Sequence, residues 1–131
     1  MKTLSEMKTL VENGKTHLLT IEKAKELKGK TISTIYFGYS GQDGVDNFVV
    51  GEVMSELEYY RNLKEDCFPD KYGFKNRAEY WESYMNKEKL EEKRNTNLLL
   101  TADGRNTYIR ETGEGVFWCS DEDRWVRYVE D

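Results

Sequence analysis

The chain has 131 residues, of which 37% are hydrophobic, 13% are aromatic and 34% are charged, and its net charge at pH 7 is −5. This length fits a single domain, residues 1–131, with a core that needs no disulfide bonds, and the aromatic content argues against intrinsic disorder. The first thirty residues contain no continuous apolar run and the chain has only two cysteines, so we expect a cytoplasmic protein with no membrane segment and no disulfide framework.

Two short helices are predicted in the N-terminal segment, residues 1–29. Thr3 and Glu6 have the spacing of a capping box, and apolar residues follow at helical spacing until Gly14. Thr20 is placed to cap a second helix, whose lysine-rich side we interpret as a solvated surface. The first helix has only a narrow apolar stripe and therefore needs a surface to dock on.

The first strand pair is predicted in residues 31–60, where a glycine-rich turn joins two strand-forming segments. This segment contains five acidic residues and no lysine or arginine. From Val49 to Tyr59, small or apolar residues alternate with positions that include three glutamates, which is the period of a half-buried strand. The stretch Glu52–Tyr60 also fits an amphipathic helix, because Val53 and Leu57 have helical spacing. We expect the strand.

A loop and an inserted helix are predicted in residues 61–95. The only proline, Pro69, lies in a stretch without periodicity, and Asn76 and Glu79 resemble a further capping box. After Met85 the sequence is strongly polar, so we expect the second half of this helix to project into solvent. The apolar face of the first half consists of Tyr80, Trp81, Tyr84 and Met85.

Two hairpins are predicted in residues 96–131. Asp103–Gly104 is a strong two-residue turn signal and would place Leu99 opposite Tyr108. A four-residue loop, Ser120–Asp123, would close the second hairpin. Its register would pair Trp118 with Trp125 and Phe117 with Val126.

These elements predict an α+β protein. We expect a small antiparallel β-sheet or an SH3-like half-barrel of about five strands, with short N-terminal helices and one helical insertion between strands. The layout resembles an SH3-like barrel in strand count and loop spacing alone, and a likeness of fold does not supply a function.

Charge is distributed unevenly along the chain. Residues 1–30 carry +3 and residues 61–95 carry +1, whereas residues 31–60 carry −5 and residues 96–131 carry −4. The predicted sheet therefore has a negative field, and direct binding of nucleic acid by the sheet is not expected, because a phosphate backbone needs clustered lysine and arginine. An acidic surface favours a protein partner with a basic surface.

The residue types that carry catalysis or metal binding form no recognisable set. His17 is the sole histidine, so one chain cannot build a histidine-based triad or a multi-histidine metal site. Cys67 follows Asp66, whose charge disfavours a reactive thiolate, and we interpret both cysteines as structural. The acidic turns lack calcium-loop spacing and the glycine-rich turn lacks a phosphate-loop lysine, so neither a metal nor a cofactor is expected. Paired carboxylates that meet only in space are left open.

A candidate binding site combines aromatic and acidic residues. In one interpretation they line a groove for a basic ligand, and in the other the aromatic residues belong to the core of the sheet. The candidate residues are Tyr36, Tyr39, Asp43, Asp46, Trp118, Asp121, Glu122, Asp123 and Trp125.

These observations favour a non-catalytic binding protein that acts by protein–protein contact through an acidic, aromatic sheet face. A compact acidic chain without catalytic motifs fits an inhibitor of a basic nucleic-acid-binding protein, of the type that mobile elements encode, with carboxylates in place of phosphates. The alternative is a small-molecule binder or enzyme with a pocket between the sheet and the inserted helix.

Overall fold

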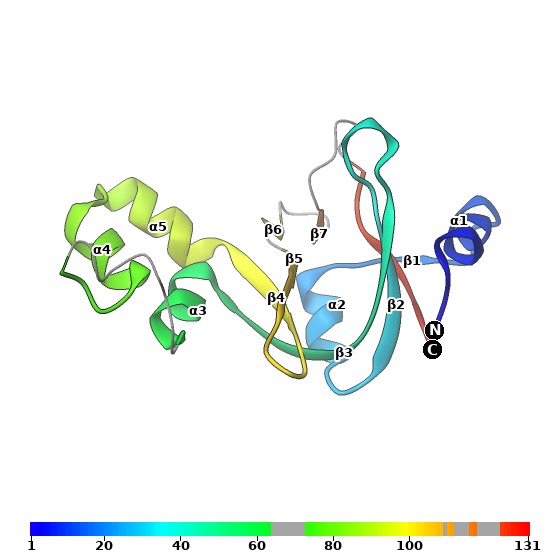
Figure 1. Cartoon of the computed structure of the whole chain (residues 1–131), viewed down its shortest axis with the longest axis horizontal. Coiled ribbons are helices and arrows are strands. Elements are labelled where there is room, and N and C mark those ends of the chain that lie inside the picture. The colour runs from blue at the N-terminus through cyan, green and yellow to red at the C-terminus, as the bar shows by residue number, and fades with distance from the viewer. Residues whose placement is uncertain (64–72, 109, 112–115, 118–123) are drawn as a thin grey trace. The chain divides into compact units, whose positions relative to one another are not determined.

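The computed structural model describes residues 1–63, 73–108, 110–111, 116–117 and 124–131 (Figure 1). Contacts divide the chain into two compact units. The first, which we call the sheet unit, consists of Met1–Val53 and Leu99–Asp131, and the second, the helical unit, is Met54–Leu98. The helical unit includes the whole of the predicted insertion, residues 61–95, and the single domain stays a prediction.

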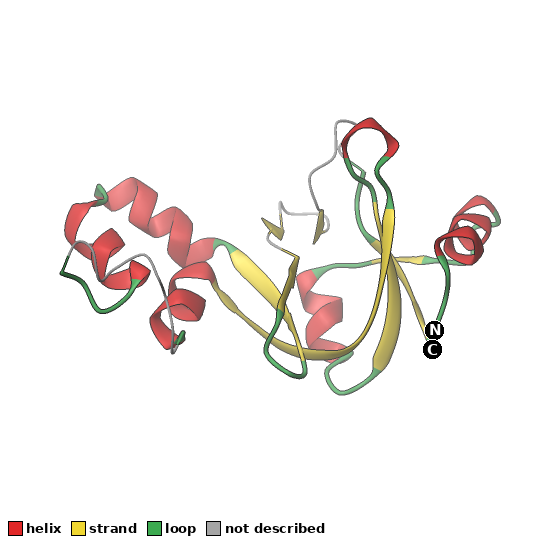
Figure 2. Cartoon of the chain, in the orientation of Figure 1, coloured by secondary structure: helices red, strands yellow, loops and turns green. Residues whose placement is uncertain are grey.

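Helices and strands follow one another in an α+β pattern (Figure 2). The helices are α1 (Leu4–Glu12), α2 (Ile21–Glu26), α3 (Glu56–Asn62), α4 (Arg77–Tyr84) and α5 (Lys87–Asn95), with one 3₁₀ turn, η1 (Tyr39–Gly41). The strands are β1 (His17–Leu18), β2 (Thr31–Tyr36), β3 (Gly44–Ser55), β4 (Asn97–Thr101), β5 (Asn106–Tyr108), β6 (Arg110–Glu111), β7 (Val116–Phe117) and β8 (Arg127–Glu130).

Six strands form one sheet in the order β1-β8-β2-β3-β4-β5, and β6 pairs with β7 in a separate ribbon. The pairs β1–β8, β8–β2, β2–β3 and β4–β5 are antiparallel. The α+β prediction is therefore confirmed. The sheet is not closed into an SH3-like barrel, because β1 and β5 are edge strands that do not pair with each other in the described part of the chain.

Both faces of the sheet are covered within the sheet unit. Ile32 and Ile35 of β2 point to opposite faces because strand residues alternate, and each belongs to a different buried cluster. The cluster on the α2 side consists of Leu19, Ile21, Ala24, Leu27, Ile32, Phe48, Val50, Leu99, Val126 and Tyr128. The cluster on the α1 side consists of Met7, Ile35, Phe37 and Val129. Residues 32–35 are consequently buried, so the middle of β2 offers no sheet face to a partner.

The two N-terminal helices begin as predicted. Thr3 and Glu6 make both halves of the capping box of α1, and the Thr20 side chain accepts a hydrogen bond from the Lys23 N–H at the start of α2. Met7 of α1 is completely buried against the sheet, which supplies the docking surface that its narrow stripe requires.

The strand predicted through Tyr59 is wrong after Ser55. There β3 ends and α3 begins, because the Ser55 hydroxyl accepts a hydrogen bond from the Glu58 N–H and so caps a helix. The rest of the first strand pair is confirmed, with Thr31 opposite Val49 at one end of the hairpin.

In residues 54–63 and 73–98, the described part of the helical unit, three helices lie around a small core of Leu57, Ala78 and Trp81. Asn76 caps α4 as predicted, but the single long helix expected there is two helices. The break occurs at Met85, and the Asn86 side chain then accepts from the Lys89 N–H to start α5.

The first C-terminal hairpin has the predicted pair Leu99–Tyr108, but its loop is longer than expected. The N–H of Thr101 donates to the Arg105 carbonyl, so three residues form the loop, and a bulge next to Leu99 restores the predicted pair.

The predicted second hairpin is wrong in its described part. Phe117 lies opposite Arg110 rather than Val126, and β8 inserts between β1 and β2. The predicted pair of Trp118 with Trp125 and the loop Ser120–Asp123 lie outside the described residues.

Candidate binding site at the β2–β3 hairpin

Four of the predicted site residues come together at the closed end of the β2–β3 hairpin. We call residues 36–46 the hairpin tip; it contains Tyr36, Tyr39, Asp43 and Asp46. Half-buried Trp125 lies elsewhere in the sequence, but the guanidinium carbon of its neighbour Arg124 lies 3.6 Å from the centre of the Phe37 ring. The predicted residues Trp118, Asp121, Glu122 and Asp123 lie outside the described part of the chain.

The backbone of the hairpin tip is tightly constrained. In η1 the Gln42 N–H donates to the Tyr39 carbonyl at 3.1 Å. Ser40 has a φ of 55°, a left-handed conformation that is uncommon outside glycine. A side chain on Gly38 would lie 2.4 Å from the Gln42 carbonyl oxygen, so the turn closes only with glycine there. This turn therefore depends on glycine at position 38 and on the left-handed conformation of Ser40.

The two tyrosines of the hairpin tip differ in their surroundings. Tyr36 lies directly opposite Gly44, and its phenol oxygen would be 2.1 Å from a Cβ at that position, so its ring covers the glycine. Tyr36 also packs against the α2-side core. Tyr39, in contrast, is 54% exposed. Tyr39 is therefore the aromatic group that the tip presents to solvent.

The acidic residues of the hairpin tip are held by contacts within the sheet unit. The Asp43 side chain is 13% exposed, and its carboxylate lies 3.8 Å from the ammonium of Lys8 on α1. Asp46 lies opposite Thr34, whose hydroxyl donates to the Asp46 backbone carbonyl at 3.3 Å. Lys8 was not predicted as part of the site, because nothing in the local sequence connects α1 with the turn.

Ion pairs join the basic segments of the chain to its acidic segments. Each pair combines a lysine of residues 1–30 or 61–95 with a carboxylate of residues 31–60 or 96–131. The pairs are Lys8–Asp43, Lys28–Glu52, Lys30–Glu130 and Lys93–Glu56. Some carboxylates of the strand-forming segments are thus paired with lysines from other segments, which the charge summed along each segment does not show.

A partly buried polar network lies in the middle of the same hairpin. The hydroxyl of the fully buried Ser33 is 2.8 Å from an Asp131 carboxylate oxygen and 2.5 Å from the Asn47 side-chain oxygen. That amide oxygen also accepts from the Lys2 N–H at 3.0 Å. The network ties the segments at both chain termini, which lie side by side in Figure 1, to the hairpin.

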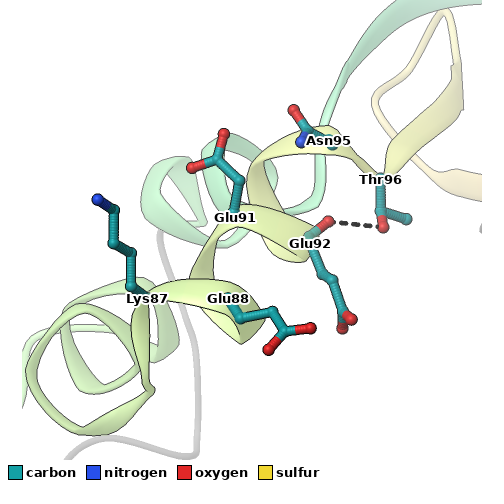
Figure 3. Close-up of a pocket in the computed structure, with 6 residues that line it drawn as sticks. All are labelled: Lys87, Glu88, Glu91, Glu92, Asn95 and Thr96. Atoms are coloured by element: carbon teal, nitrogen blue, oxygen red, sulfur yellow. Dashed lines mark hydrogen bonds between the residues drawn. The ribbon is translucent and has the colours of Figure 1, made fainter.

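The helical unit has its own exposed features. Tyr84 is 71% exposed and its ring contacts those of Phe74 and Tyr80. A depression runs along α5 and is lined by Lys87, Glu88, Glu91, Glu92, Asn95 and Thr96 (Figure 3). Glu91 there pairs with Arg94 at 3.4 Å. This lining comes from one helix and the residue after it, so the depression is an open surface.

Three titrating groups among the described residues of the sheet unit have shifted pKa values, and all three lie outside the hairpin tip. The hydrogen bond and ion pair with Glu26 raise the pKa of the exposed Lys23. A hydrogen bond from the Thr101 hydroxyl holds the pKa of Asp103 below its ordinary value. Burial raises the pKa of Tyr128. Asp103 is an exposed residue of the β4–β5 loop and Tyr128 belongs to the core, so each shift has a structural cause.

Three further observations bear on function. In the described residues, no group of three or more histidine, cysteine, aspartate or glutamate side chains is arranged to hold a metal ion. The helices of that part of the chain are all too short or too polar to cross a bilayer. Comparison of the chain with family models, curated proteins and solved structures found no match.

Proposed function

We propose that this chain is a non-catalytic binding protein that contacts a basic protein partner through the hairpin tip. The observation that carries the proposal is Tyr39, which is 54% exposed on a turn with a constrained backbone. Aromatic residues dominate the energetics of protein interfaces, and a preformed loop loses little entropy when it binds. The binding surface is thus the end of the predicted sheet face.

The charge of the hairpin tip supports a basic partner. Asp43 and Asp46 follow the turn that presents Tyr39, and residues 36–46 themselves contain no lysine or arginine, although Lys8 and Arg124 lie beside them. Such a surface attracts lysine and arginine side chains and repels a phosphate backbone. Within the basic proteins we favour those that bind nucleic acids, which the chain inhibits by offering carboxylates where phosphates bind.

Affinity capture from cell lysate with the full-length chain and matched variants tests this proposal. Tyr39→Ala removes the exposed ring of the tip, and Tyr84→Ala removes a still more exposed ring of the helical unit as a control. We expect Tyr39→Ala to weaken binding of the captured basic proteins about tenfold or more, the loss typical of an interface hot spot, and Tyr84→Ala to leave it unchanged.

Capture should also decrease between low and physiological salt, because exposed charge pairs are screened. Equal capture by wild type and Tyr39→Ala, or capture that does not respond to salt, would refute the proposed function.

A further inference from the structure

The contact between α1 and the hairpin tip points to an internal competitor for the partner. We propose that Lys8 occupies the place on Asp43 that a lysine or arginine of the partner takes, so that the free protein holds its own binding site in an occupied state. This inference rests on the proposed function, and it identifies Lys8 as a residue that moves when the partner binds.

The two side chains of the Lys8–Asp43 pair differ in their accessibility to solvent. The Asp43 side chain is only 13% exposed, whereas that of Lys8 is 50% exposed. The Lys8 ammonium lies 3.8 Å from the carboxylate, at the outer limit of an ion pair. Half of the Lys8 side chain is in solvent already, so its ammonium can turn away from the carboxylate, and in the proposed complex the partner's cation takes its place.

Contacts other than the Lys8–Asp43 pair hold α1 in place. This helix is held by Met7, which is completely buried against Ile35 and Val129 of the sheet. Its N-terminus is held by the Thr3–Glu6 capping box. The Lys8–Asp43 pair is thus not required to keep α1 on the sheet, and Lys8 can leave the carboxylate while the helix stays in place.

The Lys8–Asp43 pair is weak enough for a partner to replace. Ion pairs on protein surfaces are weak, and their loss changes an equilibrium constant by about fivefold at most. A partner that brings its own lysine or arginine to Asp43 replaces such a contact at little cost. Lys8 consequently lowers the affinity for basic partners moderately and does not block binding.

The test uses a fluorescently labelled arginine-rich peptide as the probe and fluorescence anisotropy of the full-length chain at low salt. Lys8→Met removes the ammonium and keeps an apolar side chain. Lys15→Met is the matched control, because Lys15 is an exposed lysine just after α1 for which the described residues show no ion pair. Both variants change the net charge by the same amount. Asp43→Asn and the double variant Lys8→Met/Asp43→Asn complete a double-mutant cycle. A thermal melt of each variant verifies that it is folded.

We expect Lys8→Met to tighten peptide binding by about two- to fivefold, Lys15→Met to have a clearly smaller effect, and Asp43→Asn to remove the gain from Lys8→Met. If Lys8→Met and Lys15→Met tightened peptide binding equally, the effect would come from net charge alone and the inference would be overturned. Weaker binding by Lys8→Met would overturn it as well. If the wild type binds the peptide with an affinity that depends on Tyr39 and neither lysine variant changes it, the inference fails alone. If the wild type does not bind the peptide, the proposed function fails and the inference with it.

Discussion

Strands β3 and β4 approach each other closely at Gly51. Packing and backbone propensity therefore predict opposite changes in the free energy of unfolding when this glycine is replaced by alanine. A Cβ at Gly51 would lie 2.2 Å from the Thr101 carbonyl oxygen and 2.5 Å from its carbonyl carbon, both backbone atoms. Contacts of this kind ordinarily begin at 3.4 Å, so Gly51→Ala requires the strands to separate by about 1 Å or to lose local hydrogen bonds. Overpacking of this kind costs about 1–3 kcal/mol.

Backbone propensity predicts the opposite effect for Gly51→Ala. Replacing a strand glycine by alanine ordinarily stabilises a protein by about 0.4–1 kcal/mol, because the unfolded chain has less freedom to lose. The overpacking cost of the contact with Thr101 exceeds this gain, so we expect the free energy of unfolding to fall by about 1–2 kcal/mol. Urea denaturation followed by tryptophan fluorescence measures the change. Val49→Ala, at a 39% exposed neighbour on the same strand, should cost less. An unchanged or raised stability of Gly51→Ala would refute the close approach of the two strands.

Two further predictions concern the hydroxyl groups of Ser55 and Thr101. Ser55→Ala removes the cap of α3 and should lower stability by about 1 kcal/mol, seen as a lower thermal midpoint by circular dichroism; an unchanged midpoint would place the start of α3 elsewhere. The lowered pKa of Asp103 means that its contribution to stability is fully present above the ordinary carboxyl pKa and is lost as pH falls through the lowered value. An NMR titration of the Asp103 carboxyl should therefore give a pKa below that of an exposed aspartate, and Thr101→Val should move it back up, whereas an equal pKa in both proteins would contradict the hydrogen bond.

Helix starts could be predicted from the sequence wherever a capping residue preceded a clear helical pattern. Thr3, Thr20 and Asn76 were identified in this way, and each caps a helix. Ser55 carries the same signal, with Glu58 three residues later, but it lies inside a stretch whose residues fit a period of two as well as a helix. The hydrogen bond at the cap, and not the periodicity, decides between the two structures.

The partner of the last strand could not be predicted from the sequence. Thr34 of β2 pairs with Tyr128 of β8, close to the other end of the chain. The predicted hairpin assumed that neighbours in sequence pair, which is the more frequent arrangement. A distant pairing leaves no local pattern, because the residues that pair are nearly a hundred positions apart in the sequence.

The candidate site stays a prediction, and one contact within it could not be read from the sequence. Charge summed along a segment describes a surface only if the segment does not pair with another one. Asp43 lies in the most acidic segment of the chain, yet in the fold a lysine from the most basic segment is beside it. Opposite charges that are separated in sequence tend to meet, because pairing lowers the electrostatic energy of the folded chain. The charge that the free protein shows at its surface therefore differs from the charge summed along a segment. At the hairpin tip Tyr39 is 54% exposed, whereas the Asp43 side chain is 13% exposed and already paired with Lys8.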